Sequence, residues 1–161
     1  MLNPIGNQAV KDALANLGVH EDPPGSNRGK YVDTYNTFVG APLGSAWCCS
    51  FLLFRLYHAA EELKLKTDVL KTGSVQQLFK WAEKEGRVYK QPVAGDVFVL
   101  WFNNLRRYAH TGLIVDVIIE KGLVKILTVE GNTSATGSRE GTLVAKKTRT
   151  WTEEFRALRL G

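Results

Sequence analysis

Residues 44–54 read Gly-Ser-Ala-Trp-Cys-Cys-Ser-Phe-Leu-Leu-Phe, and they contain both cysteines of the 161-residue chain, Cys48 and Cys49. A polar loop with a glycine runs here directly into an apolar segment of helical character. At least one thiol is therefore expected at a helix N-terminus, where unpaired backbone N–H groups and the helix dipole favour a thiolate. Such a thiolate is a candidate nucleophile. The alternative is that both cysteines are small core residues, because free cysteine is among the most buried residue types.

Length and composition predict one globular domain over residues 1–161. The chain is 44% hydrophobic and 23% charged, which is enough to build a core without covalent staples. Two adjacent cysteines cannot build a disulfide framework, so we expect free thiols. Residues 1–18 lack the pattern of a signal peptide, and no run approaches the roughly eighteen apolar residues of a membrane span. We therefore expect synthesis in the cytoplasm without a signal peptide and no membrane insertion.

The net charge of +5 comes from basic residues that are scattered along the chain. Attraction to an anionic polymer is compatible with this charge, and a solvated surface explains it equally well. No recognition motif accompanies the basic residues, so we expect no nucleic-acid partner.

The first half of the chain has the periodicity of helices. Apolar spacing predicts helices over residues 5–18, 31–38 and 48–63, with a fourth that begins at Ser74 and ends at Gly86. In the second helix Tyr31 and Tyr35 are expected on one side. In the third, Arg55 is expected on a narrow polar stripe, so that this helix is central and mostly buried.

After Pro92 the pattern changes to strands. Four segments are rich in β-branched and aromatic residues, and residues 155–160 add a possible fifth; the four are 96–102, 111–119, 123–129 and 142–148. Helices followed by consecutive strands predict an α+β fold, in which an antiparallel meander packs against the cysteine-bearing helix.

A thiolate nucleophile needs a base, and the chain has three histidines. His58 lies ten residues along the predicted helix from Cys48, about 15 Å away, so it cannot serve that thiol. His20 lies in an irregular segment and is more simply explained as a solvated loop residue. His110 follows a polar loop predicted over residues 103–109 and begins a strand, which is a rigid place from which a side chain can face a helix N-terminus.

The group that orients the histidine is expected from the next strand. If the two strands form a hairpin around residues 120–122, then His110 comes into register with Glu130 or Asn132. A carboxylate or a carboxamide can fix the tautomer of an imidazole. The alternative for Glu130 and Asn132 is a strand end followed by a turn.

Together these motifs resemble the CHAP family, the cysteine, histidine-dependent amidohydrolases and peptidases of the papain-like cell-wall hydrolases. The resemblance rests on Trp47-Cys48 entering a helix, Gly95-Asp96 opening a strand, His110-x-Gly112, and Val129-Glu130-Gly131-Asn132. A lead-in similar to that of single-domain members precedes them: Leu17-Gly18-Val19, then Glu21, then Ser26-Asn27-x-Gly29. Each motif is short, and their order and spacing carry the likeness over nearly the whole chain.

The resemblance implies a papain-like, CHAP-type fold with the catalytic cysteine at the N-terminus of the central helix. Cys48 would be the nucleophile, His110 the general base and then acid, and Glu130 the orienting residue, with Asn132 as helper or alternative. Cys49 stands where family members carry a small residue, so it is expected to be a packing thiol.

The resemblance further implies that Trp47, Glu21 and Asn27 contribute to substrate binding. A buried aromatic beneath the helix is an equally good account of Trp47.

Family substrates are amide bonds of bacterial peptidoglycan, so the sequence predicts an amidase or peptide endopeptidase that acts through an acyl-enzyme. The region 21–29 lacks the acidic calcium-binding loop of some members, so we expect no metal, no cofactor and activity that a chelator leaves intact. We expect a monomer that reaches the wall after release or export, as a phage lysin, an exported effector or a hydrolase with a partner. The rival from another class is a catalytically silent peptidoglycan-binding or phage-structural module.

Overall fold

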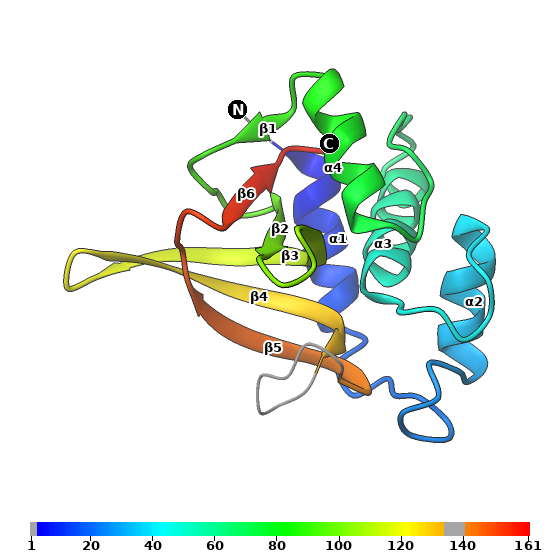
Figure 1. Ribbon diagram of the computed structural model, residues 1–161. Helices are drawn as coiled ribbons and strands as arrows, with labels where there is room; N and C mark the ends of the chain where they lie inside the picture. Colours follow the sequence, from blue (N-terminus) through cyan, green and yellow to red (C-terminus); the bar gives the residue numbers. More distant parts are fainter. Residues whose placement is uncertain (1–2, 134–140) are drawn as a thin grey trace.

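The computed structural model describes residues 3–133 and 141–161 and has an α+β fold. Four helices and six strands are formed by the described residues (Figure 1). The helices are α1 (Pro4–Leu14), α2 (Lys30–Val39), α3 (Cys48–Glu62) and α4 (Val75–Lys84). The strands are β1 (Val88–Tyr89), β2 (Val97–Phe102), β3 (Arg107–Glu120), β4 (Leu123–Thr133), β5 (Leu143–Thr150) and β6 (Phe155–Leu158).

The strands form one antiparallel sheet in the order β1-β6-β2-β3-β4-β5. Strands β2 to β5 are consecutive neighbours, so the predicted meander is confirmed. The β3–β4 hairpin turns at residues 121–122, where Glu120 pairs with Leu123, and its register brings Leu113 opposite Val129. The same register directs residue 110 toward the far end of β4.

The helices gather on one side of the sheet (Figure 1), and α3 packs on both β3 and β4. The main core lies between these layers and includes Phe51, Leu53 and Val129. A smaller cluster formed by Phe98, Ile114, Ile126 and Phe155 covers the other face of the sheet. Residues that alternate along β2 divide between the two clusters, as expected for a strand with period two.

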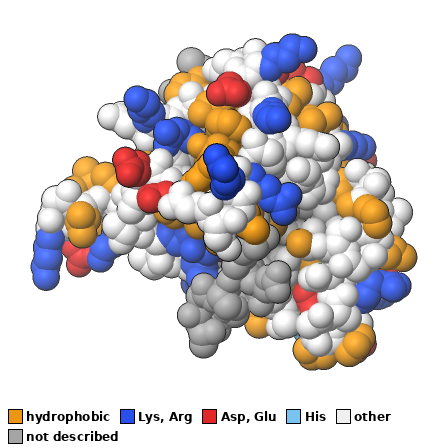
Figure 2. All heavy atoms as spheres, in the orientation of Figure 1, with side chains coloured by type: hydrophobic (Ala, Val, Ile, Leu, Met, Phe, Trp, Pro, Cys, Tyr) orange, Lys and Arg blue, Asp and Glu red, His pale blue; other side chains and the backbone are white. Residues whose placement is uncertain are grey.

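Basic side chains are dispersed over several elements on the face drawn in Figure 2. Among the described residues, no helix combines the length and the apolar character that crossing a membrane requires.

The helices differ from the sequence predictions at two points, the end of α1 and the burial of Arg55. Helix α1 ends at Leu14 rather than at residue 18, because Asn16 donates its side-chain amide to the Asp12 carbonyl in the last turn. In α2, Tyr31 and Tyr35 lie four residues apart and therefore on the same side of the helix, as predicted, but Tyr31 is exposed while Tyr35 is buried. Arg55 is buried rather than part of a polar stripe, since its guanidinium packs over aromatic rings, including that of Tyr35.

Ser74 and Gln77 have the sequence spacing of a capping box at the start of α4, and this prediction is confirmed in part. Ser74 is the N-cap and accepts a hydrogen bond from the Gln77 backbone N–H. The Gln77 side chain does not return to Ser74. It accepts from the Thr72 hydroxyl, and that hydroxyl oxygen in turn accepts from the Ser74 N–H.

The sheet is more extensive than predicted. Strand β3 begins at Arg107, so His110 lies inside a strand and not at its start. Strand β4 continues to Thr133, so Glu130 and Asn132 are strand residues rather than a turn. Strand β3 has a bulge next to His110, because Leu100 of β2 pairs with His110 and Trp101 with Tyr108, which leaves Ala109 as an extra residue. Pairing of polar residues with neighbouring strands, which single-strand patterns do not reveal, accounts for the added length.

Candidate active site

Cys48 is the first residue of α3, directly after the N-cap Trp47, and 5% of its surface is exposed. The helix start lies close against β4, because a Cβ on Gly131 would come within 2.9 Å of both Trp47 and Phe51. Gly131 therefore permits the close approach that brings the cysteine toward the end of the β3–β4 hairpin. The backbone N–H groups of this first turn lack partners within the helix.

His110 and Glu130 form a buried pair on neighbouring strands. His110 Nε2 lies 2.6 Å from Glu130 Oε2, and the two side chains are 3% and 0% exposed. The side chain of Glu130 passes over Gly112, where a Cβ would come within 2.7 Å of Glu130 Cγ. Sequence register had left Glu130 and Asn132 as alternatives, and the structure pairs the histidine with Glu130.

Two further residues, which the sequence did not suggest, bind Glu130. The Thr128 hydroxyl donates to Oε1 at 2.6 Å. Arg149 on β5 donates Nε–H to Oε1 and Nη2–H to Oε2, both at 2.7 Å. With the imidazole, the carboxylate thus has four short contacts. Arg149 lies one residue beyond the strand predicted over residues 142–148 and close to the basic pair 146–147, a pattern that a solvated surface explains equally well.

These contacts set the charge of Glu130. Burial alone opposes ionisation, but the hydrogen bonds from Arg149 and His110 outweigh it and lower the pKa of Glu130 from 4.5 to about 2. The carboxylate is therefore ionised at neutral pH.

His110 is shifted in the opposite direction. Burial disfavours the imidazolium, but hydrogen bonds to Cys48 and Glu130 outweigh burial and raise the pKa of His110 from 6.5 to about 9. Because Nε2 is bound to Glu130, Nδ1 is the ring nitrogen left to meet the Cys48 sulfur. The structure thus brings together Cys48, His110 and Glu130.

A pocket of about 380 Å³ opens beside Cys48. Its other walls are residues 45–46 before α3, residues 73–76 at the start of α4, and residues 107–109 at the start of β3. Two helix N-termini and the exposed Arg107 thus line one side of the thiol. Such an environment favours negative charge.

Cys49 and the other histidines are not part of this arrangement. Cys49 is fully buried, and its thiol donates to the Thr72 carbonyl. Burial raises the pKa of the Cys49 thiol well above its ordinary value, which agrees with a packing role. Both cysteines are free thiols. His20 contacts the Gly18 carbonyl, and His58 faces two carboxylates on the surface of α1 and α3.

The residues predicted to bind substrate lie elsewhere. Trp47 is fully buried and donates its indole N–H to Glu21 Oε1 at 2.8 Å, while Glu21 Oε2 accepts from the Gly25 N–H. Glu21 is 1% exposed. Neither side chain lines the pocket at Cys48, and both serve to tie the loop after α1 to the start of α3. Asn27 lies in the same loop with φ of 53° and does not line that pocket either.

Asn132 is buried at the end of β4 with φ of 51°, a left-handed conformation that asparagine tolerates. Its Oδ1 is buried and accepts no hydrogen bond within the described part of the chain. No bond to His110 is formed.

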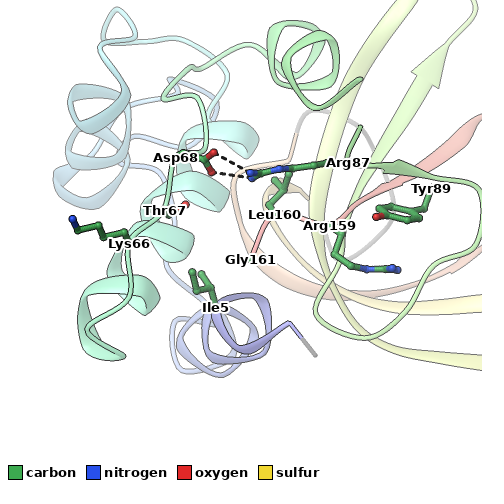
Figure 3. Close-up of a pocket in the computed structure, with 9 residues that line it drawn as sticks. All are labelled: Ile5, Lys66, Thr67, Asp68, Arg87, Tyr89, Arg159, Leu160 and Gly161. Carbon is green, nitrogen blue, oxygen red and sulfur yellow. Dashed lines mark hydrogen bonds and ion pairs between the residues drawn. The ribbon is translucent and has the colours of Figure 1, made fainter. Parts of the chain in front are cut away.

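A second pocket lies near the C-terminus, between α1, β1 and residues 66–68 (Figure 3). Both of its arginines are already paired, Arg87 with Asp68 and Arg159 with the buried Asp96. No cysteine or histidine lines it.

Within the described residues, one group could offer metal ligands, namely Asp12, His58 and Glu62, with atoms within 4.8 Å of one another. Gln8 already binds both carboxylates. The candidate active site is therefore the pocket at Cys48.

Comparison of the chain with protein-family models, curated proteins and solved structures finds no match.

Proposed function

We propose that the protein is a cysteine-dependent hydrolase of the CHAP type, with a papain-like arrangement, that cleaves amide bonds of bacterial peptidoglycan. The observation that carries the proposal is a buried imidazole held between Glu130 and Cys48, the latter lining a pocket. A nucleophile, a base and an orienting group within contact of one another are the parts that acyl transfer requires. The order Cys48, His110, Glu130 is also the order of the family motifs.

In the first step the Cys48 sulfur attacks the carbonyl carbon of the scissile amide. His110 carries its proton at neutral pH, and a cationic imidazole beside a sulfur favours the thiolate. The carbonyl oxygen gains negative charge as the C–S bond forms, and the backbone N–H of Cys48 at the start of α3 donates to it. When the C–N bond breaks, His110 passes its proton to the leaving amine, and a thioester remains.

In the second step, water completes the cycle. Neutral His110 takes a proton from water, which attacks the thioester carbon. The C–S bond breaks, the carboxylic acid leaves, and the Cys48 sulfur and His110 return to their starting state. Glu130 keeps Nε2 of the imidazole protonated and aimed, so that Nδ1 serves both proton transfers.

The proposal is tested by incubating purified protein with purified peptidoglycan and following newly released amino groups, with mass spectrometry of the fragments. Wild-type protein should release fragments, Cys48→Ala should release none, and Cys49→Ala should keep activity because that thiol only packs in the core. The mass of the fragments distinguishes cleavage at the sugar–peptide amide from cleavage within the peptides.

Release by Cys48→Ala at the wild-type rate would overturn the catalytic assignment. Sedimentation of wild-type protein with peptidoglycan without any release of fragments would favour a binding module instead.

A further inference from the structure

The carboxylate of Glu130 is bound to a guanidinium as closely as to the histidine. Arg149 contacts both of its oxygens at 2.7 Å, and His110 shares one of them at 2.6 Å. Such a bidentate pair fixes the plane of a carboxylate as well as offsetting its charge. The side chain of Glu130 is fully buried, while that of Arg149 is 19% exposed.

The β4–β5 register explains how the arginine reaches this position. Glu130 pairs with Ala145, and Arg149, four residues further along β5, pairs with Ile126. Because Ala145 and Arg149 are an even number of residues apart, both lie on the side of the sheet that Glu130 faces, and the long arginine side chain reaches the carboxylate along that side. The guanidinium of Arg149 lies over the ring of Phe98, 5.6 Å from its centroid, and that ring also contacts His110.

We infer that Arg149 is a positioning residue, which fixes the carboxylate of Glu130 against His110 and offsets its charge. The inference rests on the proposed function for its catalytic meaning. An isolated carboxylate would hold the imidazolium strongly and resist transfer of its proton to the leaving amine. With Arg149 in place, Glu130 still accepts the hydrogen bond that orients the His110 ring. The ion pair of Glu130 with Arg149 carries little net charge, so it holds the imidazolium less strongly.

The groups that act on His110 come from three elements. Cys48 faces it from α3, Glu130 from β4, and Arg149 from β5 beyond the carboxylate. Lys147 on β5 also acts on Glu130, and its Nζ is buried without a hydrogen-bond partner within the described residues. From β2 the contact is the uncharged ring of Phe98. Removal of Arg149 should therefore leave His110 facing more negative charge.

The test is an NMR titration of the His110 ring in the Cys48→Ala background, which needs no substrate. Arg149→Gln keeps one donor for Glu130 but removes the charge, so the His110 pKa should rise by about one unit or more. Arg149→Lys keeps the charge, so its titration should stay much closer to the parent. Arg87→Gln, which removes an arginine from the second pocket, is the matched control and should not change the titration.

An unchanged or lower His110 pKa in folded Arg149→Gln would overturn the inference. If Arg149→Gln does not fold, the test is the turnover of Arg149→Lys on peptidoglycan, measured with Cys48 intact. It should fall about tenfold or more because an ammonium cannot bind both oxygens in one plane, and wild-type turnover would refute the positioning role. If the wild type lacks hydrolytic activity, the His110 pKa in Arg149→Lys decides instead. A rise in that pKa as large as the one expected for Arg149→Gln would refute the claim that the charge of residue 149 offsets that of Glu130. The titration is thus independent of the peptidoglycan assay, so the two proposals fail separately.

Discussion

The stability of the protein should depend on pH through Glu130. The pKa of this carboxyl is lowered from 4.5 in the absence of structure to about 2 in the fold. Its stabilising effect is therefore complete above about pH 4.5 and is lost as pH falls from there toward 2. A pKa shift of this size corresponds to about 3 kcal/mol of unfolding free energy.

The perturbation that isolates this effect is Glu130→Gln. The variant leaves the mostly buried Arg149 without its counter-charge, so it should cost about 3–5 kcal/mol at about pH 5.5. As pH falls and Glu130 takes up a proton, the wild-type protein loses the additional unfolding free energy that it has over Glu130→Gln. The difference in unfolding free energy between the two proteins should therefore shrink by about 3 kcal/mol between about pH 5.5 and pH 2.

Urea unfolding at a series of pH values, followed by tryptophan fluorescence, measures this difference. Asp68→Asn is the control, because Asp68 is also paired with an arginine but lies on the surface. Its profile should stay close to that of the wild type, since exposed ion pairs contribute little. A gap between wild type and Glu130→Gln that stays constant throughout the acid range would refute the reasoning.

On the alkaline side the sign is reversed. The pKa of His110 is raised from 6.5 to about 9, so its stabilising effect is complete below about pH 6.5 and is lost as pH rises toward 9. The two windows overlap between about pH 4.5 and 6.5. Maximum stability is expected there.

Two further substitutions test the packing around the site. Gly112→Ala should cost about 1–3 kcal/mol in urea unfolding, because the new methyl group meets Glu130 with no space to spare, and a wild-type midpoint would contradict this contact. Trp47→Phe should cost about 3 kcal/mol, since it removes the hydrogen bond to one oxygen of the buried Glu21; a loss below about 1 kcal/mol would show that the bond is dispensable.

The sequence predicted the helix α3 and the antiparallel meander because both have strong periodic patterns. It also predicted the pairing of residue 110 with the end of β4, since a tight hairpin turn fixes the register of both strands. Polar strand ends were missed. Arg107 looked like a loop residue until its pairing with Phe102 was known.

The site was predictable only as far as its motifs and one hairpin. Arg149 was missed because it lies just beyond the strand predicted over residues 142–148 and close to other basic residues that look solvated; only the β4–β5 register brings it to Glu130. For Trp47 the alternative to substrate binding, a buried aromatic beneath the helix, agrees with the structure, and its indole binds Glu21. That contact joins the loop after α1 to the start of α3. A contact between residues so far apart in the chain cannot be predicted from the spacing of apolar residues within one helix or strand.

The order of the site residues along the chain has a consequence for biosynthesis. Cys48 stands in the first third of the sequence, while His110, Glu130 and Arg149 follow much later on three consecutive strands. A ribosome therefore extrudes α3 while the residues that are to face its thiol are still untranslated. From the synthesis of α3 until that of β3, the nascent chain carries the Cys48 thiol without His110 beside it, and the complete cluster first exists when β5 has joined the sheet.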